Sequence, residues 1–166
     1  MLIFLVGFMG CGKSYVGRNL APMLGFDYVD VDKFIEEKEG MSIKEIFELK
    51  GEDYFRKLEQ QYLQDLDTDQ NLVVSTGGGA PCFFDNMDVM NEKGLTIYLN
   101  RNKEKVIWRL LKGQHKRPLI AGLSEDELKV FYDERLESRK PFYEKAKLHV
   151  GDADVPEILD ILKKNP

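Results

Sequence analysis

Residues 7–14 read GFMGCGKS and match the pattern G-x-x-x-x-G-K-[ST]. The apolar run LIFLV comes directly before this motif, and an amphipathic run of helical period follows it. A strand before and a helix after are the context in which such a loop wraps phosphate groups in backbone amides. The sequence therefore predicts a phosphate-binding loop between a buried strand and a helix.

The residues of this loop also indicate which phosphate compound it binds. Lys13 is expected to reach the β- and γ-phosphates of ATP, and the Ser14 hydroxyl is expected to bind the Mg²⁺ that bridges them. The alternative, an exposed lysine after a glycine-rich turn, is disfavoured by the flanking strand and helix. The predicted nucleotide contacts of the loop are Gly10, Cys11, Gly12, Lys13, Ser14 and Tyr15.

Four further apolar runs of strand length lie at residues 28–31, 72–75, 95–99 and 148–150. Helical patterns separate most of them, and this alternation predicts an α/β fold with a parallel sheet. Two stretches stand outside the alternation: a helical span over residues 42–66, and residues 112–146, where no strand is predicted. We expect these stretches to carry substrate-binding and lid elements.

Composition limits the class of protein. A chain of 166 residues with 43% hydrophobic content suffices for one core, so we expect a single domain over residues 1–166. The net charge of -5 argues against non-specific binding to nucleic acid. No apolar run approaches the roughly 20 residues that span a bilayer, and the N-terminus lacks the basic region of a signal peptide. We therefore expect a soluble, cytoplasmic protein without a membrane partner, in which Cys11 and Cys82 form no disulfide.

Two acidic residues end the second predicted strand. In Asp30-Val-Asp32 the period of two would place both carboxylates on one face, at the strand's carboxyl end. Ligands of open α/β sheets bind at that edge. One acid would then hold a metal-bound water and the other would accept a hydrogen bond from an attacking hydroxyl. Capping of the following helix by Asp32 is an alternative that the sequence leaves open.

Three other segments admit both a functional and a structural interpretation. The glycines of residues 76–79, TGGG, would leave amides open to a ligand or simply form a tight turn. Arg56 would pair with Glu59 on a helix surface, which is the favoured interpretation of that helix alone. The basic run HKRPL at residues 115–119 would clamp phosphate or remain a solvated loop.

Arg139 lies two residues before Pro141, near the end of the second strand-free stretch. An arginine at this point would bind a carboxylate through two parallel hydrogen bonds. The proline predicts a break between two helices.

Taken together, these segments resemble shikimate kinases along nearly the whole chain. GFMGCGKS, VDVD, GEDYFRKLE, STGGGAP, KRPLIAG and SRKPFYEKA occur in that family's order. The resemblance implies a three-layer α/β/α P-loop kinase fold with a five-stranded parallel sheet. It also implies a substrate-binding segment over residues 32–66, a lid over residues 112–124, and a monomer.

The resemblance further implies the reaction: transfer of a phosphoryl group from ATP to the 3-hydroxyl of shikimate, with Mg²⁺, on the route to chorismate and the aromatic amino acids. Asp32 would bind the shikimate hydroxyls and act as the base, and Asp30 would hold a magnesium-bound water. Arg56 and Arg139 would bind the shikimate carboxylate, for which the planar guanidinium group is suited. The backbone of Gly78 would contact a hydroxyl.

Two further arginines acquire roles from the resemblance. Arg117 matches the lid arginine that closes over the transferring phosphoryl group, so Lys13, Asp32 and Arg117 form the expected catalytic set. Arg109 resembles the arginine that stacks near adenine. The rival functions are a gluconate-type or nucleoside-monophosphate kinase, from which the pair of Arg56 and Arg139 discriminates because a carboxylate acceptor needs them, and a non-catalytic nucleotide switch.

Overall fold

Five parallel strands form the centre of the computed structural model, which describes residues 1–166. The strands are β1 (Leu2–Val6), β2 (Asp27–Asp30), β3 (Leu72–Ser75), β4 (Leu95–Tyr98) and β5 (Leu148–His149). Their order in the sheet is β2-β3-β1-β4-β5. Phe4 of β1 pairs with Val74 of β3 on one side and with Thr96 of β4 on the other. The predicted five-stranded parallel sheet is confirmed.

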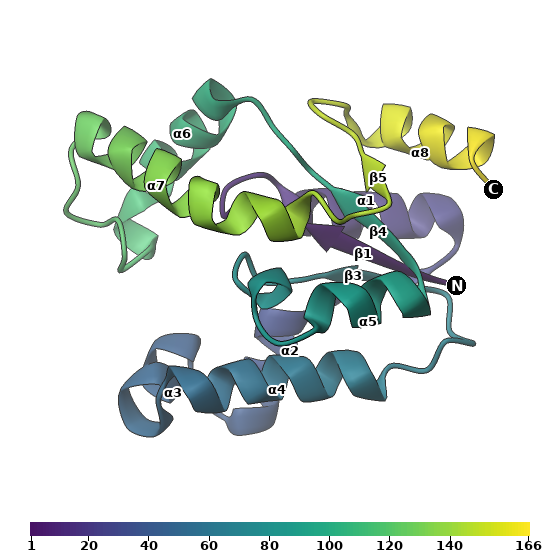
Figure 1. The fold of residues 1–166 in the computed structure, drawn as a ribbon, viewed down its shortest axis with the longest axis horizontal. Helices are drawn as coiled ribbons and strands as arrows, with labels where there is room; N and C mark the ends of the chain where they lie inside the picture. Colours follow the sequence, from purple (N-terminus) through teal and green to yellow (C-terminus); the bar gives the residue numbers. More distant parts are fainter.

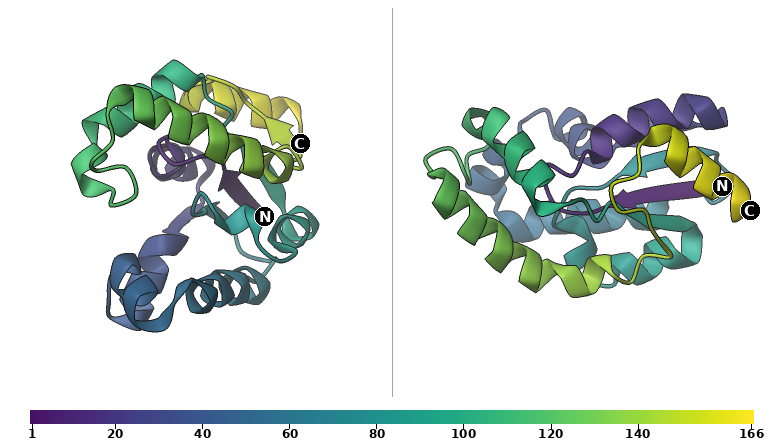
Figure 2. Two further views of the ribbon diagram at one scale, coloured as in Figure 1. Left: turned by 60° about the vertical axis from the view of Figure 1, so that its left-hand side comes forward. Right: turned by 90° about the horizontal axis from the view of Figure 1, so that it is seen from above.

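The central strand β1 is buried on both faces, which explains its unbroken apolar sequence. Ile3 and Leu5 point into one apolar layer, whereas Leu2, Phe4 and Val6 point into the other. Helices α1 (Lys13–Leu24) and α8 (Val155–Lys164) cover the first of these layers. In Figure 2 (right) they lie on one side of β1, and α7 lies on the other. The three-layer α/β/α prediction is therefore confirmed.

The remaining helices form the other layer and two projecting segments. They are α2 (Val31–Glu39), α3 (Ile43–Lys50), α4 (Glu52–Asp65), α5 (Asn86–Lys93), α6 (Lys103–Lys112) and α7 (Glu125–Tyr143), with 3₁₀ turns η1 (Ala80–Cys82) and η2 (Gln114–Lys116). Figure 1 shows α3 and α4 at the bottom of the molecule and α6 with the start of α7 at the top left. None of the helices combines the length and apolar composition that crossing a bilayer requires.

The predicted helical span over residues 42–66 is divided into two helices. Gly51 adopts φ 87 and ψ 163, a conformation outside the helical range, and separates α3 from α4. Its N–H donates to the carbonyls of Ile46 and Phe47, which closes the last turn of α3. Glycine reaches this backbone region without the steric cost that a Cβ atom brings.

The helix break predicted at Pro141 is wrong. Pro141 lies inside the last turn of α7, which continues to Tyr143. A proline removes one backbone hydrogen bond from a helix. Only two helical residues follow Pro141, so the helix loses little by including it. Because the helix continues, Arg139 and Tyr143 are separated by one helical turn and lie on the same face.

Candidate active site

The phosphate-binding loop joins β1 to α1 and depends on glycines in left-handed conformations. Gly10 has φ 78, and Gly12, with φ 91, is the N-cap of α1. Lys13 follows and is almost completely buried. Its Nζ donates to the carbonyl oxygens of Gly7, at 2.7 Å, and Phe8, at 3.1 Å. The ammonium group is therefore already held inside the loop, at the N-terminus of a helix.

A cavity of about 550 Å³ opens above this loop, a volume suited to a small-molecule ligand. Its walls come from the loop, the β2–α2 junction, the glycine triplet after β3, and the lid side. It is lined by Met9, Gly10, Gly12, Lys13, Ser14, Tyr15, Asp30, Asp32, Thr76, Gly77, Gly78, Arg109 and Arg117. Most of the predicted site residues therefore meet in one cavity, although they are distributed over more than 100 positions of the chain.

Cys11 is the predicted nucleotide contact of the loop that does not line the cavity. It is 1% exposed, and its backbone N–H donates to the carbonyl of Phe8 at 3.2 Å. Its Sγ lies 3.7 Å from the Nζ of Lys13, on the inner side of the loop. The predicted contact of Cys11 with the nucleotide stays a prediction. In the structure its side chain packs in the apolar layer beneath the loop.

Asp30 and Asp32 reach the cavity in a different way from the one predicted. Strand β2 ends at Asp30 and α2 begins at Val31, so Asp32 lies in the first helical turn, and the two-residue strand period does not apply. The helix cap is Asp30, whose Oδ1 accepts from the N–H of Lys33 at 3.3 Å. Its Oδ2 accepts from the hydroxyl of Ser14 at 2.9 Å. Asp30 thus links the loop to α2, and the capping alternative for Asp32 is wrong.

Asp32 is half-buried, and one of its carboxylate oxygens is buried without a protein partner. Its Oδ1 has no hydrogen bond. Burial, and then the negative charge of Asp30, raise the pKa of Asp32 to about 6, against opposition from Lys13 and Arg56. The group is mostly ionised at neutral pH, yet its proton affinity is higher than that of an ordinary aspartate. These are the properties of a hydrogen-bond acceptor for a reacting hydroxyl.

The glycine triplet lets charged side chains approach the backbone after β3. A Cβ atom on Gly77 would lie 2.9 Å from Asp32 Oδ1 and 3.1 Å from Glu59 Oε2. One on Gly78 would lie 3.3 Å from Arg139 Nη1, and one on Gly79 would lie 2.6 Å from Arg56 Nη2. None of the three glycines has a positive φ. Space for the neighbouring charges, rather than backbone conformation, is what these positions require.

Arg56 and Glu59 form an ion pair, as the helix pattern indicated, but the pair is buried. Arg56 is 8% exposed and Glu59 is 0% exposed, and Arg56 Nη1 lies 2.7 Å from Glu59 Oε1. Burial raises the pKa of Glu59 to about 7, although the charge of Arg56 acts in the opposite direction. The other oxygen, Oε2, is buried without a partner. The surface interpretation of this pair is therefore wrong.

Sequence reasoning missed Glu59 and Tyr143 as parts of the site. The signal for Glu59 was available, because the apolar face of α4 runs through Phe55 and Leu63 and includes position 59. Tyr143 is fully buried and donates its hydroxyl proton to the carbonyl of Gly78. Tyr143 lies one helical turn beyond Arg139. The same face of α7 therefore forms a hydrogen bond to the triplet through Tyr143 and places the Arg139 guanidinium group beside it.

A smaller hollow of about 260 Å³ adjoins the main cavity and shares Gly12, Tyr15 and Arg109 with it. Its far wall is the turn after β5, with Asp152 and Ala153. Arg101 supports this turn by donating to the carbonyl of Gly151 at 2.9 Å and to that of Cys11 at 3.3 Å. The hollow continues the phosphate site outward along α1, which is where the base of a nucleotide would extend.

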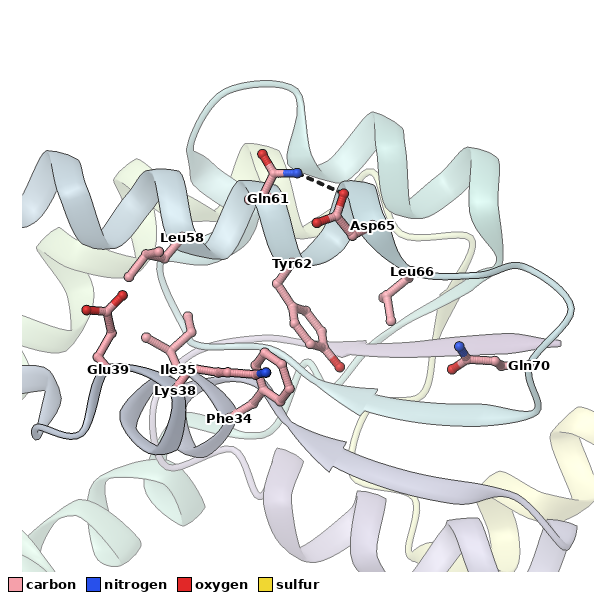
Figure 3. Close-up of a pocket in the computed structure, with 10 residues that line it drawn as sticks. All are labelled: Phe34, Ile35, Lys38, Glu39, Leu58, Gln61, Tyr62, Asp65, Leu66 and Gln70. Atoms are coloured by element: carbon pink, nitrogen blue, oxygen red, sulfur yellow. Dashed lines mark hydrogen bonds between the residues drawn. The ribbon is translucent and has the colours of Figure 1, made fainter.

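A separate hollow of about 440 Å³ lies between α2 and α4, as Figure 3 shows. Half of its lining is apolar, with the rings of Phe34 and Tyr62 packed at a centroid distance of 4.6 Å. It shares no residue with the cavity above the phosphate loop. Because it contains none of the predicted site residues, the candidate active site is the cavity at the loop.

Comparison with known proteins supplies the family. A family model described as shikimate kinase matches residues 9–164. The chain belongs to the shikimate kinase family. Its members are kinases with ATP as co-substrate, and the protein is an enzyme of this kind, which phosphorylates shikimate.

Individual relatives agree with this assignment. The shikimate kinase of Parabacteroides distasonis is 41% identical over 168 residues, covering 98% of this chain and 97% of its own. A crystal structure of shikimate kinase from Bacteroides thetaiotaomicron is 38% identical, with a TM-score of 0.88 over 99% of this chain and 96% of its own. Shikimate kinase from Acinetobacter baumannii in complex with shikimate is 34% identical, with a TM-score of 0.85 over 99% and 93%. The similarity to shikimate kinases therefore covers the whole architecture.

The raised pKa of Asp32 predicts a stability effect that depends on pH. Asp32 has a pKa of about 6 in the folded protein and 3.8 as an ordinary aspartate, so its protonation stabilises the folded state. This contribution to the free energy of unfolding is fully present below pH 3.8 and is lost as the pH rises through 6. Asn does not titrate. The free energy of unfolding of Asp32→Asn minus that of the wild type should therefore increase by about 2 kcal/mol between pH 4.5 and pH 8.

Urea denaturation with a metal chelator present measures this difference. Asp65→Asn, at an exposed position on α4, is the matched control and should show no such increase. A difference for Asp32→Asn that is the same at both pH values would contradict the raised pKa of Asp32.

Proposed function

We propose that the protein transfers the γ-phosphoryl group of ATP to the 3-hydroxyl of shikimate, giving shikimate 3-phosphate and ADP, through the residues described above. The observation that carries this proposal is the meeting of two sites at one glycine triplet. Gly77 and Gly78 line the cavity above the phosphate loop, and the same triplet contacts Asp32, Arg56 and Arg139. A phosphate donor and a carboxylate-bearing acceptor would therefore lie side by side.

The residues present fit a magnesium ion. The Ser14 hydroxyl and the Asp30 carboxylate are 2.9 Å apart at the floor of the cavity. Both are hard oxygen donors, and Mg²⁺ in kinases typically takes only one or two protein oxygens together with phosphates and water. Ser14 would bind the ion directly, and Asp30 would hold one of its waters. When bound, the ion neutralises charge on the β- and γ-phosphates.

Lys13 and Arg117 act on the transferring phosphoryl group. The Lys13 ammonium rests on loop carbonyls at hydrogen-bond distance, so a phosphate oxygen would replace carbonyl oxygens as its partner. Arg117 lines the cavity from the loop after η2 and forms none of the ion pairs of the structure. Its positive charge is therefore available for the phosphoryl group, where it is worth most once water is excluded.

Asp32 orients the acceptor hydroxyl and accepts its hydrogen bond. Its partnerless Oδ1 and its pKa of about 6 suit that role near neutral pH. Arg56 and Arg139, which contact the two ends of the Gly78–Gly79 peptide, bind the acceptor carboxylate from the other side. The backbone of Gly78 contacts a hydroxyl. An acceptor without an anionic group would leave the guanidinium groups of Arg56 and Arg139 without a ligand, and a pair of planar guanidinium groups favours a carboxylate.

The remaining assignments follow from the same arrangement. We propose that residues 1–166 form a single domain and act as a cytoplasmic monomer, with residues 32–66 binding shikimate and residues 112–124 serving as the lid. Helices α2 and α4, within the first segment, supply Asp32 and Arg56. The second segment contains Arg117. Arg109 and Tyr15, which line both the main cavity and the smaller hollow, contact the nucleotide beyond its phosphates.

A coupled ADP-release assay with ATP and Mg²⁺ tests the acceptor. Shikimate should stimulate ADP release strongly above the rate without acceptor, whereas gluconate and a nucleoside monophosphate should not. A nucleoside monophosphate has no carboxylate for the arginine pair, and the flexible open chain of gluconate would have to be ordered before its carboxylate and a hydroxyl could reach the arginines and Asp32 together. Preference for one of the other two acceptors would retain the kinase and reject shikimate. Equal rates with every acceptor would favour a nucleotide switch.

Arg117 and Arg56 should respond differently to removal, because one contact grows in the transition state and the other is present throughout the reaction. Arg117→Ala should lower kcat by about 10²-fold or more with little change in the KM for shikimate. Arg56→Ala should raise that KM by at least about tenfold, because it removes a charged hydrogen-bond donor.

Steady-state kinetics with both substrates measure the two constants separately. Arg18→Ala removes an exposed arginine of α1 and should change neither. The role assignments would be overturned by the reverse pattern, with Arg56→Ala acting on kcat and Arg117→Ala on KM.

A further inference from the structure

The Arg56 guanidinium group is enclosed by more than its ion pair. In its plane, Nη1 lies 2.7 Å from Glu59 Oε1 and Nε lies 3.3 Å from Glu52 Oε1. Gly79 lies against the face of the group, since a Cβ atom there would lie 2.6 Å from Nη2, 2.8 Å from Nη1 and 2.9 Å from Cζ. The ring of Phe83 lies against the group, with its centroid 4.2 Å from Cζ. The ring of Phe55 also faces the group, with its centroid 5.3 Å from Cζ. Two carboxylates and two aromatic rings therefore restrain the same cation, and the ring of Phe83 is the nearer of the two.

Phe83 lies outside the hydrophobic core. It belongs to neither of the two apolar clusters of the protein, nor to the partly buried residues packed against them. The neighbouring Cys82, by contrast, does pack against the larger cluster. The ring of Phe83 is partly exposed, and it lies over the guanidinium group of Arg56.

The backbone directs Phe83 toward Arg56 by a local reversal. Turn η1 ends at Cys82, Phe83 is extended, and Phe84 adopts φ 51, the one positive φ of a non-glycine residue in the protein. Such a conformation is rarely populated by a bulky side chain. The Phe84 ring is 54% exposed, so the reversal sends one ring to solvent and the other to Arg56.

An aromatic ring suits this position because it attracts a cation without competing for its N–H groups. The negative face of the ring stabilises the guanidinium charge, but it accepts no strong hydrogen bond. A third carboxylate of the protein would add negative charge beside a cation that already pairs with two, and it would occupy the donors that a ligand needs. With Nε and Nη1 engaged by Glu52 and Glu59, the edge at Nη2 remains for an incoming carboxylate.

We propose that Phe83 is a positioning residue for the phosphoryl acceptor: its ring fixes the plane of the Arg56 guanidinium so that the Nη2 edge faces the acceptor carboxylate. This inference rests on the proposed function, in which Arg56 binds that carboxylate. The ring acts on binding in the ground state and the transition state alike, so its loss raises the KM for shikimate and leaves kcat nearly unchanged.

Substitution at Phe83 tests the ring against mere bulk. Phe83→Leu keeps an apolar side chain without a π face and should raise the KM for shikimate by about fivefold, with the KM for ATP and kcat within about twofold of the wild type. Phe83→Tyr keeps the ring and should restore a KM within about twofold of the wild type. Phe84→Leu, the matched control at the adjacent exposed ring, should change none of these constants. An unchanged KM in Phe83→Leu, or an equal increase in Phe83→Tyr, would overturn the proposal.

A double-substitution cycle separates this inference from the proposed function. In an Arg56→Lys background no guanidinium plane exists to be fixed, so Phe83→Leu should have no further effect on the KM for shikimate. A fivefold effect that persists in this background would show that the ring acts without Arg56 and would refute the inference. If Arg56→Lys alone leaves the KM for shikimate unchanged, the carboxylate role of Arg56 fails, and the inference fails with it. If Arg56→Lys raises the KM but Phe83→Leu does not, the inference alone fails.

Discussion

The site depends on a short piece of backbone without side chains. At Gly77–Gly79, directly after β3, the missing Cβ atoms allow Asp32, Glu59, Arg139 and Arg56 to approach the same three peptides. These charges come from three different helices, α2, α4 and α7. Any side chain in the triplet would push at least one of them outward, because the required approaches are shorter than ordinary van der Waals contact. The convergence of charge is therefore a steric consequence of the sequence GGG.

The parallel sheet brings this triplet to the phosphate loop. Strands β1 and β3 are neighbours, so the loops at their carboxyl ends meet at the same edge. Two hydrogen bonds connect the ends of these strands and their loops: Ser75 Oγ, at the end of β3, donates to the carbonyl of Lys13 at 2.9 Å, and Thr76 Oγ1 donates to that of Leu5 in β1 at 3.0 Å. Since the donors and acceptors are buried, these bonds fix the distance between the nucleotide side and the acceptor side. In-line transfer between two bound molecules needs such a fixed separation.

The sequence predicted what depends on local pattern and on a contiguous motif. Strands β1 and β3 begin and end at the predicted residues, since each is a buried apolar run, and the phosphate loop is a continuous motif. It did not predict what depends on contacts between distant elements. The burial of the Arg56–Glu59 pair requires the triplet to lie over α4, and the inward packing of Cys11 requires the loop to be folded. The position of Asp32 in a helix was missed because strand and helix patterns both fit VDVD, and the cap at Asp30 decides between them.

The most direct test of this account is calorimetric titration of Gly77→Ala with shikimate and, separately, with ADP and Mg²⁺. Gly77 has no positive φ, so alanine is compatible with its backbone, and the added Cβ would lie 2.9 Å from Asp32 Oδ1. The account predicts that the affinity for shikimate falls by at least about tenfold, or about 1.4 kcal/mol, while the affinity for ADP stays within about twofold. Unchanged binding of shikimate would contradict the claim that the glycine triplet creates the acceptor site by letting charged side chains approach it.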